Sequence, residues 1–178
     1  MNTAERIEHP WCHWLADDFL SAECLRELKS IDIEHGQAVR GRRRNSVRTF
    51  VDHTYSDVWP CLWQLWHDLD GPLRQWFNLY TGIDYSGMYV RLEVISDRGW
   101  FELAPHCDHA EKRLTAFVYT DHADLWPGTE LTHGHRVESR DNRCFFFVPG
   151  TDTIHSYPRT YFDRVRRCLQ INYWTVPA

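Results

Sequence analysis

His106 and Asp108 stand two residues apart in the stretch APHCDHA, with Cys107 between them. In an extended strand the side chains at i and i+2 point to the same face, so His106 and Asp108 would converge and Cys107 would point away. An imidazole nitrogen and a carboxylate oxygen on one face are two of the ligands that a metal site needs. Both residue types are also common on protein surfaces, so the spacing alone leaves a metal site and an ordinary surface strand open.

A third candidate ligand, His155, follows a Pro149-Gly150 turn and is expected on a short strand of its own. Two histidines and one carboxylate on neighbouring strands form the facial triad of non-haem Fe(II) oxygenases, which leaves three coordination positions open. Arg166 comes eleven residues after His155. A guanidinium group pairs with carboxylates through two hydrogen bonds and keeps its charge, so an arginine near such a metal suits a dicarboxylate cosubstrate.

The elements that must position these residues change character along the chain. Helical spacing of apolar residues predicts a helix in FLSAECLRELKSI, with Ser21 as N-cap. It also predicts helices on both sides of the Gly71-Pro72 break, the first of them with Ser56 as N-cap. The aromatic residues of these helices are interpreted as core packing. From residue 88 the hydrophobic period becomes two, which predicts a series of short strands at 88–95, 113–119, 143–150 and 167–176. Helices followed by strands predict an α+β, mainly β fold with an antiparallel barrel or sandwich.

Composition limits the class of protein. A chain of 178 residues with 43% hydrophobic residues can build one sizeable core, so we expect a single domain over 1–178, with a helical part over about 1–85 and a β core over about 86–178. The formal net charge of −5 argues against a nucleic-acid partner. The sequence shows neither a signal-peptide pattern nor an apolar run long enough to span a membrane. The six cysteines form no CxxC pair and are interpreted as buried thiols, which predicts a cytoplasmic protein.

An arginine-rich segment, RGRRRNSVRTF at residues 40–50, lies between the predicted helices and holds five arginines. One interpretation is a solvated loop or hairpin. The other is a mobile lid that offers positive charge to an anionic substrate, with Arg48 as the candidate substrate-binding residue.

Together these motifs resemble a known family. The pattern HCD, His155 and Arg166-x-Cys168 is similar to the HxD…H…Arg-x-Ser motif of the iron(II)- and 2-oxoglutarate-dependent oxygenases. KRLTAFVYTD resembles the strand after HxD in the prolyl-hydroxylase-like, small bacterial-type branch, and WPGTEL resembles the turn between its two metal-bearing segments. The resemblance covers most of 88–176 and, more loosely, 9–30. Cys168 departs from the family pattern, because serine is usual there.

The resemblance implies a double-stranded β-helix, or jelly roll, with the N-terminal helices packed on one sheet. It implies Fe(II) as cofactor, held by His106, Asp108 and His155, and 2-oxoglutarate as cosubstrate, held by Arg166 and Tyr119. Reaction with O₂ would release succinate and CO₂ and oxidise, most often hydroxylate, a small-molecule substrate that we expect to be anionic or amino-acid-like.

Strand periodicity predicts which arginine faces the cavity. Counting by two places Arg166 on one face with Cys168, Gln170 and Asn172. Arg167 falls on the other face, along an apolar surface with its charged head in solvent. A register slip of one residue would reverse the assignment.

Two alternatives remain from the sequence. One is a cupin-type metal enzyme without 2-oxoglutarate, which would use the HGHRVE segment, namely His133, His135 and Glu138, together with His155. The other is a non-catalytic jelly-roll binding domain. The sequence leaves open the substrate, the choice between hydroxylation, desaturation and cyclisation, and the oligomeric state.

Overall fold

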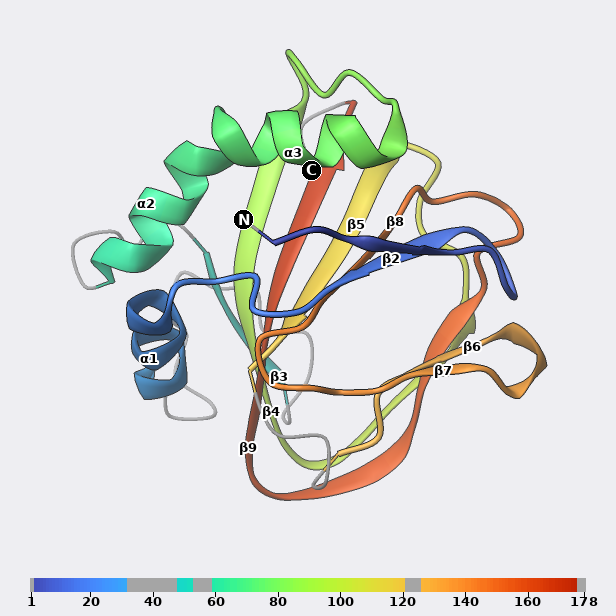
Figure 1. The fold of residues 1–178 in the computed structure, drawn as a ribbon. Coiled ribbons are helices and arrows are strands. Elements are labelled where there is room, and N and C mark those ends of the chain that lie inside the picture. The colour runs from blue at the N-terminus through green and yellow to red at the C-terminus, as the bar shows by residue number, and fades with distance from the viewer. Residues whose placement is uncertain (1, 32–47, 53–58, 121–125, 176–178) are drawn as a thin grey trace.

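In a computed structural model the chain is described over residues 2–31, 48–52, 59–120 and 126–175, with only the backbone described for 48–52 (Figure 1). The described residues of the first half form three helices and three short strands. In chain order these are β1 (Glu5–Ile7), β2 (His13–Ala16), α1 (Ala22–Ser30), β3 (Arg48–Asp52), α2 (Pro60–Leu69) and α3 (Pro72–Thr81). The first half is therefore less purely helical than expected.

The second half holds the strands that the period of two predicted, but two of them are much longer than expected. The elements are β4 (Tyr89–His106), β5 (Lys112–Tyr119), β6 (Thr129–Leu131), the 3₁₀ turn η2 (Thr132–Gly134), β7 (Arg136–Val137), β8 (Cys144–Phe147) and β9 (His155–Trp174). His155 does not lie on a short strand of its own, because it begins the same 20-residue strand that carries Arg166. A run of bulges in the β4–β9 pairing lets both long strands bend without ending.

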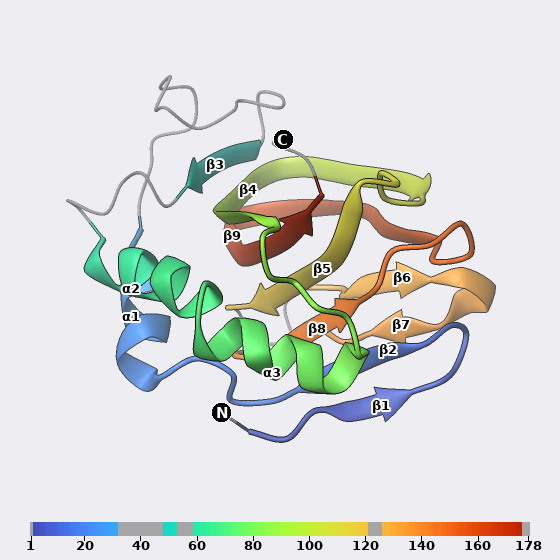
Figure 2. The same cartoon turned by 90° about the horizontal axis from the view of Figure 1, so that it is seen from above.

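All strand pairs are antiparallel, and the strands follow the order β1-β2-β8-β5-β9-β4-β3. The strand β6 leaves this path and pairs with β7 and with the beginning of β9. Figure 2 shows the result, a curled sheet in which β6 and β7 lie apart from the helices α2 and α3. This layout confirms the predicted α+β, mainly β fold of the jelly-roll type.

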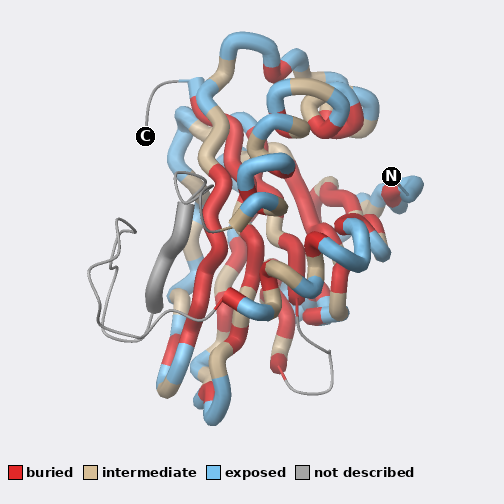
Figure 3. Tube along the Cα trace, turned by 90° about the vertical axis from the view of Figure 1, so that its left-hand side faces the viewer, coloured by how far each residue is buried: buried red, intermediate tan, exposed pale blue. Residues whose placement is uncertain are grey.

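The helices pack on one face of the sheet. The principal core joins helical residues such as Leu28, Leu62 and Phe77 to sheet residues such as Val94 and Leu169, all of them buried. Figure 3 shows this arrangement as buried stretches along the central strands, with exposed residues in the outer turns. Because side chains alternate along a strand, the residues between these core positions point to the opposite face.

Local signals explain where the helices begin and end. The Ser21 hydroxyl accepts a hydrogen bond from the Cys24 amide as the N-cap of α1, as predicted. Pro60 and Pro72 occupy the first turns of α2 and α3, where a missing N–H costs nothing. Gly82 ends α3 in the left-handed conformation, with φ of 71°. The second expected cap, Ser56, lies outside the described residues. None of the helices in the described part of the chain combines the length and hydrophobicity needed to cross a membrane.

The expectation of six buried thiols is wrong for several of the cysteines. Cys24 in α1 and Cys61 in α2 form a disulfide, and Cys107 is exposed. The neighbouring packing of α1 and α2 brings the two Cα atoms to 5.4 Å, although the residues are 37 positions apart in the chain. Sequence spacing carries no sign of that contact, because it depends on how the two helices meet in three dimensions.

Candidate metal centre

The three predicted ligands come together at one end of the paired strands β4 and β9. His106 is the last residue of β4 and pairs directly with His155, the first residue of β9. Their imidazole rings lie with centroids 4.4 Å apart. One ligand atom from each histidine and one from Asp108 all lie within 4.8 Å of one another, and no other such group of three is found among the described residues.

Asp108 reaches this position from a turn and not from a strand. The strand β4 ends at His106, and the chain then reverses into β5, with the Lys112 amide donating to the His109 carbonyl. The expected convergence of His106 and Asp108 is therefore produced by the turn. Cys107 is exposed, and its thiol donates to the Thr151 carbonyl at 3.2 Å.

Both imidazoles have one nitrogen already engaged. The Nδ1 atom of His106 lies 3.0 Å from the Ala104 carbonyl, and the Nδ1 atom of His155 lies 3.0 Å from the Thr153 carbonyl. A carbonyl oxygen can only accept, so Nδ1 carries the proton in each ring and the Nε2 lone pair is left for a metal. This arrangement is the outer hydrogen bond that usually fixes the orientation of metal-binding histidines.

Both oxygens of Asp108 also have partners. The Lys112 ammonium lies 2.6 Å from Oδ1, and the Thr115 hydroxyl donates to Oδ2 at 2.6 Å. Burial by itself would raise the pKa of Asp108. The positive charge of Lys112, the nearby His155 and the two hydrogen bonds outweigh it, so the pKa lies below its ordinary value. Asp108 is therefore ionised at neutral pH.

The protonation state of His155 complements that of Asp108. Burial lowers the pKa of His155, and the attraction of Asp108 only partly offsets this effect. His155 is therefore a neutral imidazole at neutral pH, which is the form that binds metals. Two imidazoles and an ionised carboxylate make a donor set suited to a divalent transition metal.

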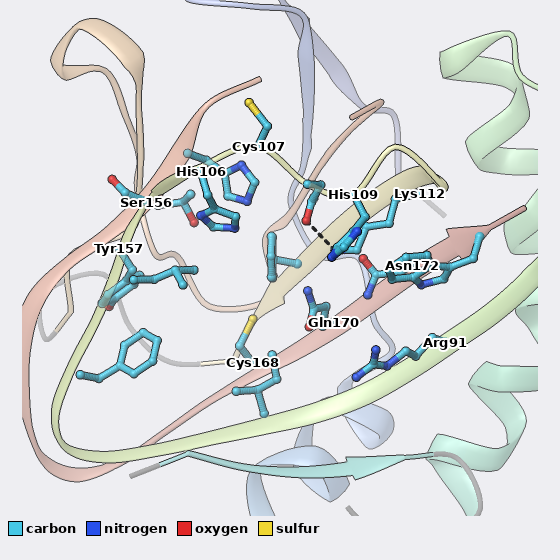
Figure 4. Close-up of a pocket in the computed structure, with 18 of the residues that line it drawn as sticks. Arg91, His106, Cys107, His109, Lys112, Ser156, Tyr157, Cys168, Gln170 and Asn172 are labelled. Carbon is cyan, nitrogen blue, oxygen red and sulfur yellow. Dashed lines mark hydrogen bonds and ion pairs between the residues drawn. The ribbon is translucent and has the colours of Figure 1, made fainter. Parts of the chain in front are cut away.

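A cavity of about 800 Å³ opens beside this triad (Figure 4). Its floor is the face of the sheet turned away from the helices, and the strand pairing orders that floor into rows. Arg91 pairs with Asn172, Glu93 with Gln170, Ile95 with Cys168 and Asp97 with Arg166. The cavity is lined by the four alternating residues of β9 that the sequence predicted, namely Arg166, Cys168, Gln170 and Asn172. The predicted register of β9 is confirmed.

Arg166 lies buried at one end of this floor. Its Nη1 atom is 2.7 Å from Asp97, and its guanidinium stacks on Tyr157, with 4.5 Å to the ring centroid. Arg167 points to the helix side, as predicted, but it is half-buried and its guanidinium contacts the protein. Its Nε atom donates to the Ile31 carbonyl at the end of α1, at 2.6 Å. The end of a helix offers carbonyl oxygens without partners, and the guanidinium satisfies one of them.

Tyr119 lies near Arg166 but is buried. It pairs with Cys168 in the sheet, and its hydroxyl forms a 2.6 Å hydrogen bond with Thr129, which lines the cavity. Burial raises the pKa of Tyr119, so the phenol stays protonated. To hydrogen-bond a cosubstrate, the Tyr119 hydroxyl would have to give up its bond to Thr129. Otherwise Tyr119 can only orient the Thr129 hydroxyl, which itself lines the cavity.

The structure leaves the predicted role of the arginine-rich segment 40–50 untested. Residues 40–47 lie outside the described part of the chain. The backbone of Arg48 begins β3 and pairs with Asp97, but its side chain is not described. The roles expected for Arg48 and its neighbours stay predictions.

The cupin-type alternative fails on geometry. His133, His135 and Glu138 are exposed around the β6–β7 turn and do not join His155 in a ligand group among the described residues. At the other end of this hairpin, Gly128 lies just before β6 against the backbone of Val137 and Ser139. A Cβ atom there would lie 1.6 Å from the Val137 carbonyl oxygen, so only glycine fits.

Sequence reasoning missed three charged or polar residues of the site. Lys112 and Thr115 hold Asp108, and Asp97 holds Arg166. Lys112 stands four residues after Asp108, and Asp97 stands two residues beyond the predicted strand 88–95, in phase with Ile95. Those spacings are the only signals that the sequence offered.

Comparison with known proteins gives a structural but not a sequence relationship. No family model matches the sequence, and no curated protein matches it either. Among solved structures, a prolyl-4-hydroxylase from Pseudomonas putida aligns with a TM-score of 0.66 and 16% identity, over 93% of each chain. The viral collagen prolyl hydroxylase of Paramecium bursaria Chlorella virus-1, in complex with 2-oxoglutarate, aligns with a TM-score of 0.60 and 13% identity, over 93% of this chain and 96% of that one.

A third similar structure has a different activity. The non-haem, α-ketoglutarate-dependent epimerase SnoN from nogalamycin biosynthesis aligns with a TM-score of 0.62 and 17% identity, over 90% of this chain and 76% of that chain. At these identities the likeness concerns the fold. The chain has the double-stranded β-helix fold that the 2-oxoglutarate-dependent oxygenases share, with a histidine–aspartate–histidine group at one end of it.

Proposed function

We propose that the protein is an Fe(II)- and 2-oxoglutarate-dependent oxygenase that hydroxylates a small, anionic or amino-acid-like substrate. One observation carries this proposal. His106, Asp108 and His155 converge, with Asp108 ionised and His155 neutral, beside a cavity that has Arg166 at one end.

The donor set fits Fe(II). Two imidazole nitrogens and one carboxylate form the facial triad of non-haem iron sites, and the carbonyls of Ala104 and Thr153 keep both Nε2 atoms available. When bound, Fe(II) with O₂ would supply the oxidation that converts 2-oxoglutarate to succinate and CO₂ and oxidises the substrate.

The rest of the chain would bind and orient the reactants. Arg166 can offer the guanidinium edge that Asp97 does not use to the far carboxylate of 2-oxoglutarate, with Thr129 and Tyr119 beside it. Ile95, Phe101, Leu103 and Phe117 supply apolar walls that limit water in the cavity.

The structural relatives support the class of reaction more than its outcome. Two of them are named prolyl hydroxylases and one is named an epimerase, so the fold accommodates more than one reaction. We choose hydroxylation because Asp108 completes the triad, which is the common condition for it. The net charge of −5 favours a small molecule over nucleic acid as substrate.

The test is Fe(II)-dependent formation of succinate from 2-oxoglutarate. Purified protein would be screened against a metabolite library, with Asp108→Ala as the inactive variant and His135→Ala as the matched control. Turnover that needs Fe(II), 2-oxoglutarate and Asp108 would support the proposal. A protein that binds no 2-oxoglutarate in the presence of a divalent metal would contradict it and would favour the non-catalytic binding domain.

A further inference from the structure

The cavity floor has a cationic group at each end. At one end lie Arg166 and its partner Asp97. At the other end lie Arg91 and Lys112, on the adjacent rows Arg91–Asn172–Thr115 and Trp174–Lys112. Figure 4 shows Lys112, Asn172 and Arg91 on one side of the cavity and Tyr157, on which Arg166 stacks, on the other side.

The two ends are too far apart for one small cosubstrate. Arg91 and Asp97 are separated by six residues of extended strand, which corresponds to about 20 Å. A five-carbon diacid anchored at Arg166 and reaching the triad leaves uncovered the Arg91 side of the cavity, which begins at Lys112 beside Asp108. This inference rests on the proposed function, because it takes the Arg166 end as the place of 2-oxoglutarate.

Charge pairing differs between the two cations of the uncovered end. Arg91 is paired with Glu93, whose side chain is buried, at 2.8 Å. Lys112 is paired with Asp108, whose carboxylate belongs to the candidate ligand set. When Asp108 binds a metal ion, its negative charge is shared with that ion and no longer balances the Lys112 ammonium alone. Arg91 keeps the full charge of Glu93, so Lys112 is the cation at this end with charge left to offer a ligand.

We propose that Lys112 recognises the carboxylate of the primary substrate. Its side chain is held at the cavity wall, with only 10% of its surface exposed and with its ammonium 5.3 Å from the centroid of the Trp174 ring. An ammonium group has three N–H donors, so Lys112 can keep one bond to Asp108 while it donates to a ligand.

The surroundings of Lys112 define the rest of the substrate. One uncompensated positive charge matches a monoanionic carboxylate better than a doubly charged phosphate ester. Gln170 and Asn172 line the same wall and can hydrogen-bond polar groups next to that carboxylate. Trp174 offers an aromatic surface to the apolar part of the molecule.

The test uses simple probes instead of the unknown substrate. Protein loaded with Mn(II) and 2-oxoglutarate under argon would be mixed with phenylacetate, butyrate and N-acetylglycine, and separately with their primary amides. Proton relaxation of each probe reports binding close to the paramagnetic ion. We expect the carboxylates to bind about tenfold more tightly than their amides, as a charge-assisted hydrogen bond provides.

Variants of Lys112 separate recognition from structure. Lys112→Met should remove the preference for carboxylate over amide, Lys112→Arg should keep it, and Lys29→Met on α1 should leave it unchanged. A purely structural role would alter acid and amide binding equally, so their ratio would not move. The inference is overturned by an unchanged ratio in Lys112→Met, by equal binding of acids and amides to the unmodified protein, or by no binding of either.

The same preparations distinguish the two proposals. Binding of 2-oxoglutarate to the Mn(II) protein and iron-dependent succinate formation test the proposed function. If both fail, the proposed function is wrong, whatever the fragments do. If both succeed and the carboxylate preference is absent, only the assignment of Lys112 is wrong.

Discussion

The β4–β9 end of the molecule and the β6–β7 turn each carry two histidines and a carboxylate, yet only the first brings them together. His106 and His155 face each other across paired strands, with Asp108 supported by two partners. His133 and His135 are two residues apart in sequence, as are His106 and Asp108, but they lie exposed around η2. Spacing therefore brings candidate ligands near each other, and burial with hydrogen-bond support decides whether they form a site.

The largest expected effect separates these two regions directly. His155→Ala should weaken binding of Fe(II) or Co(II) by more than about 100-fold, since even the loss of an outer hydrogen-bond partner costs 10- to 100-fold. His135→Ala should leave metal affinity unchanged. Calorimetric titration of metal into the two variants measures the difference. Equal metal affinity in both variants would mean that the triad is not the metal site.

The same contrast applies to two neighbours on β9. Arg166→Ala should weaken 2-oxoglutarate binding by about 30-fold or more, because it removes one partner of a desolvated ion pair with the cosubstrate. Arg167→Ala should have little effect on 2-oxoglutarate, since that side chain holds the Ile31 carbonyl on the helix side. Anaerobic titration of the metal-loaded variants tests both.

The control for Arg166 addresses folding. Arg166→Ala leaves Asp97 buried without this partner, which is a recognised source of instability. The double variant Asp97→Asn/Arg166→Gln removes both charges of the pair, so it should fold. Its affinity for 2-oxoglutarate should nevertheless be reduced, as in Arg166→Ala. Full affinity in that double variant would place the cosubstrate elsewhere.

A smaller effect is expected from the support of Asp108. Thr115→Val keeps the shape of a fully buried side chain but removes its hydrogen bond to Oδ2, so metal affinity should fall by about tenfold. The matched control is Thr160→Val on β9, where the hydroxyl donates to the Pro158 carbonyl. An unchanged metal affinity in Thr115→Val would show that Lys112 alone positions the carboxylate.

The smallest expected effect is a pH dependence of stability in the metal-free protein. The pKa of His155 is lowered by burial, while a histidine in the unfolded chain titrates at about 6.5. The unfolded state therefore takes up the proton first, and the free energy of unfolding should fall as the pH drops below about 6.5. The fall should end once the pH is below the lowered pKa of the folded state.

Denaturant unfolding at several pH values measures this dependence. His155→Asn should reduce it, and the remainder should come partly from His13, whose pKa burial also lowers. His133→Asn, at an exposed position, is the matched control. A pH dependence that is identical in His155→Asn and the unmodified protein would contradict the assigned shift.

The sequence predicted the residues of the candidate site, but not the residues that hold them in place, namely Lys112, Thr115 and Asp97. The strand period placed Arg166, Cys168 and Asn172 on the cavity face, because alternation is a property of any extended strand. It could not reveal that Asp108 leaves the strand, since a turn there depends on where β5 pairs. The disulfide between Cys24 and Cys61 and the contact of Arg167 with Ile31 depend on helix packing, which spacing along the chain does not encode.

The unbroken strand β9 has a consequence for how this protein can change over generations. His155 and Arg166 sit on one continuous strand, whose pairing with β4 already bends at bulges between them, so the eleven-residue step sets both sites at once. Insertion or deletion of a single residue in that step would turn Arg166, Cys168, Gln170 and Asn172 away from the cavity together. Substitutions can accumulate at the exposed positions of this stretch, but a change in its length would have to be absorbed by a new bulge. The interval between the two residues is therefore expected to persist among descendants of this chain after most of its amino acids have been replaced.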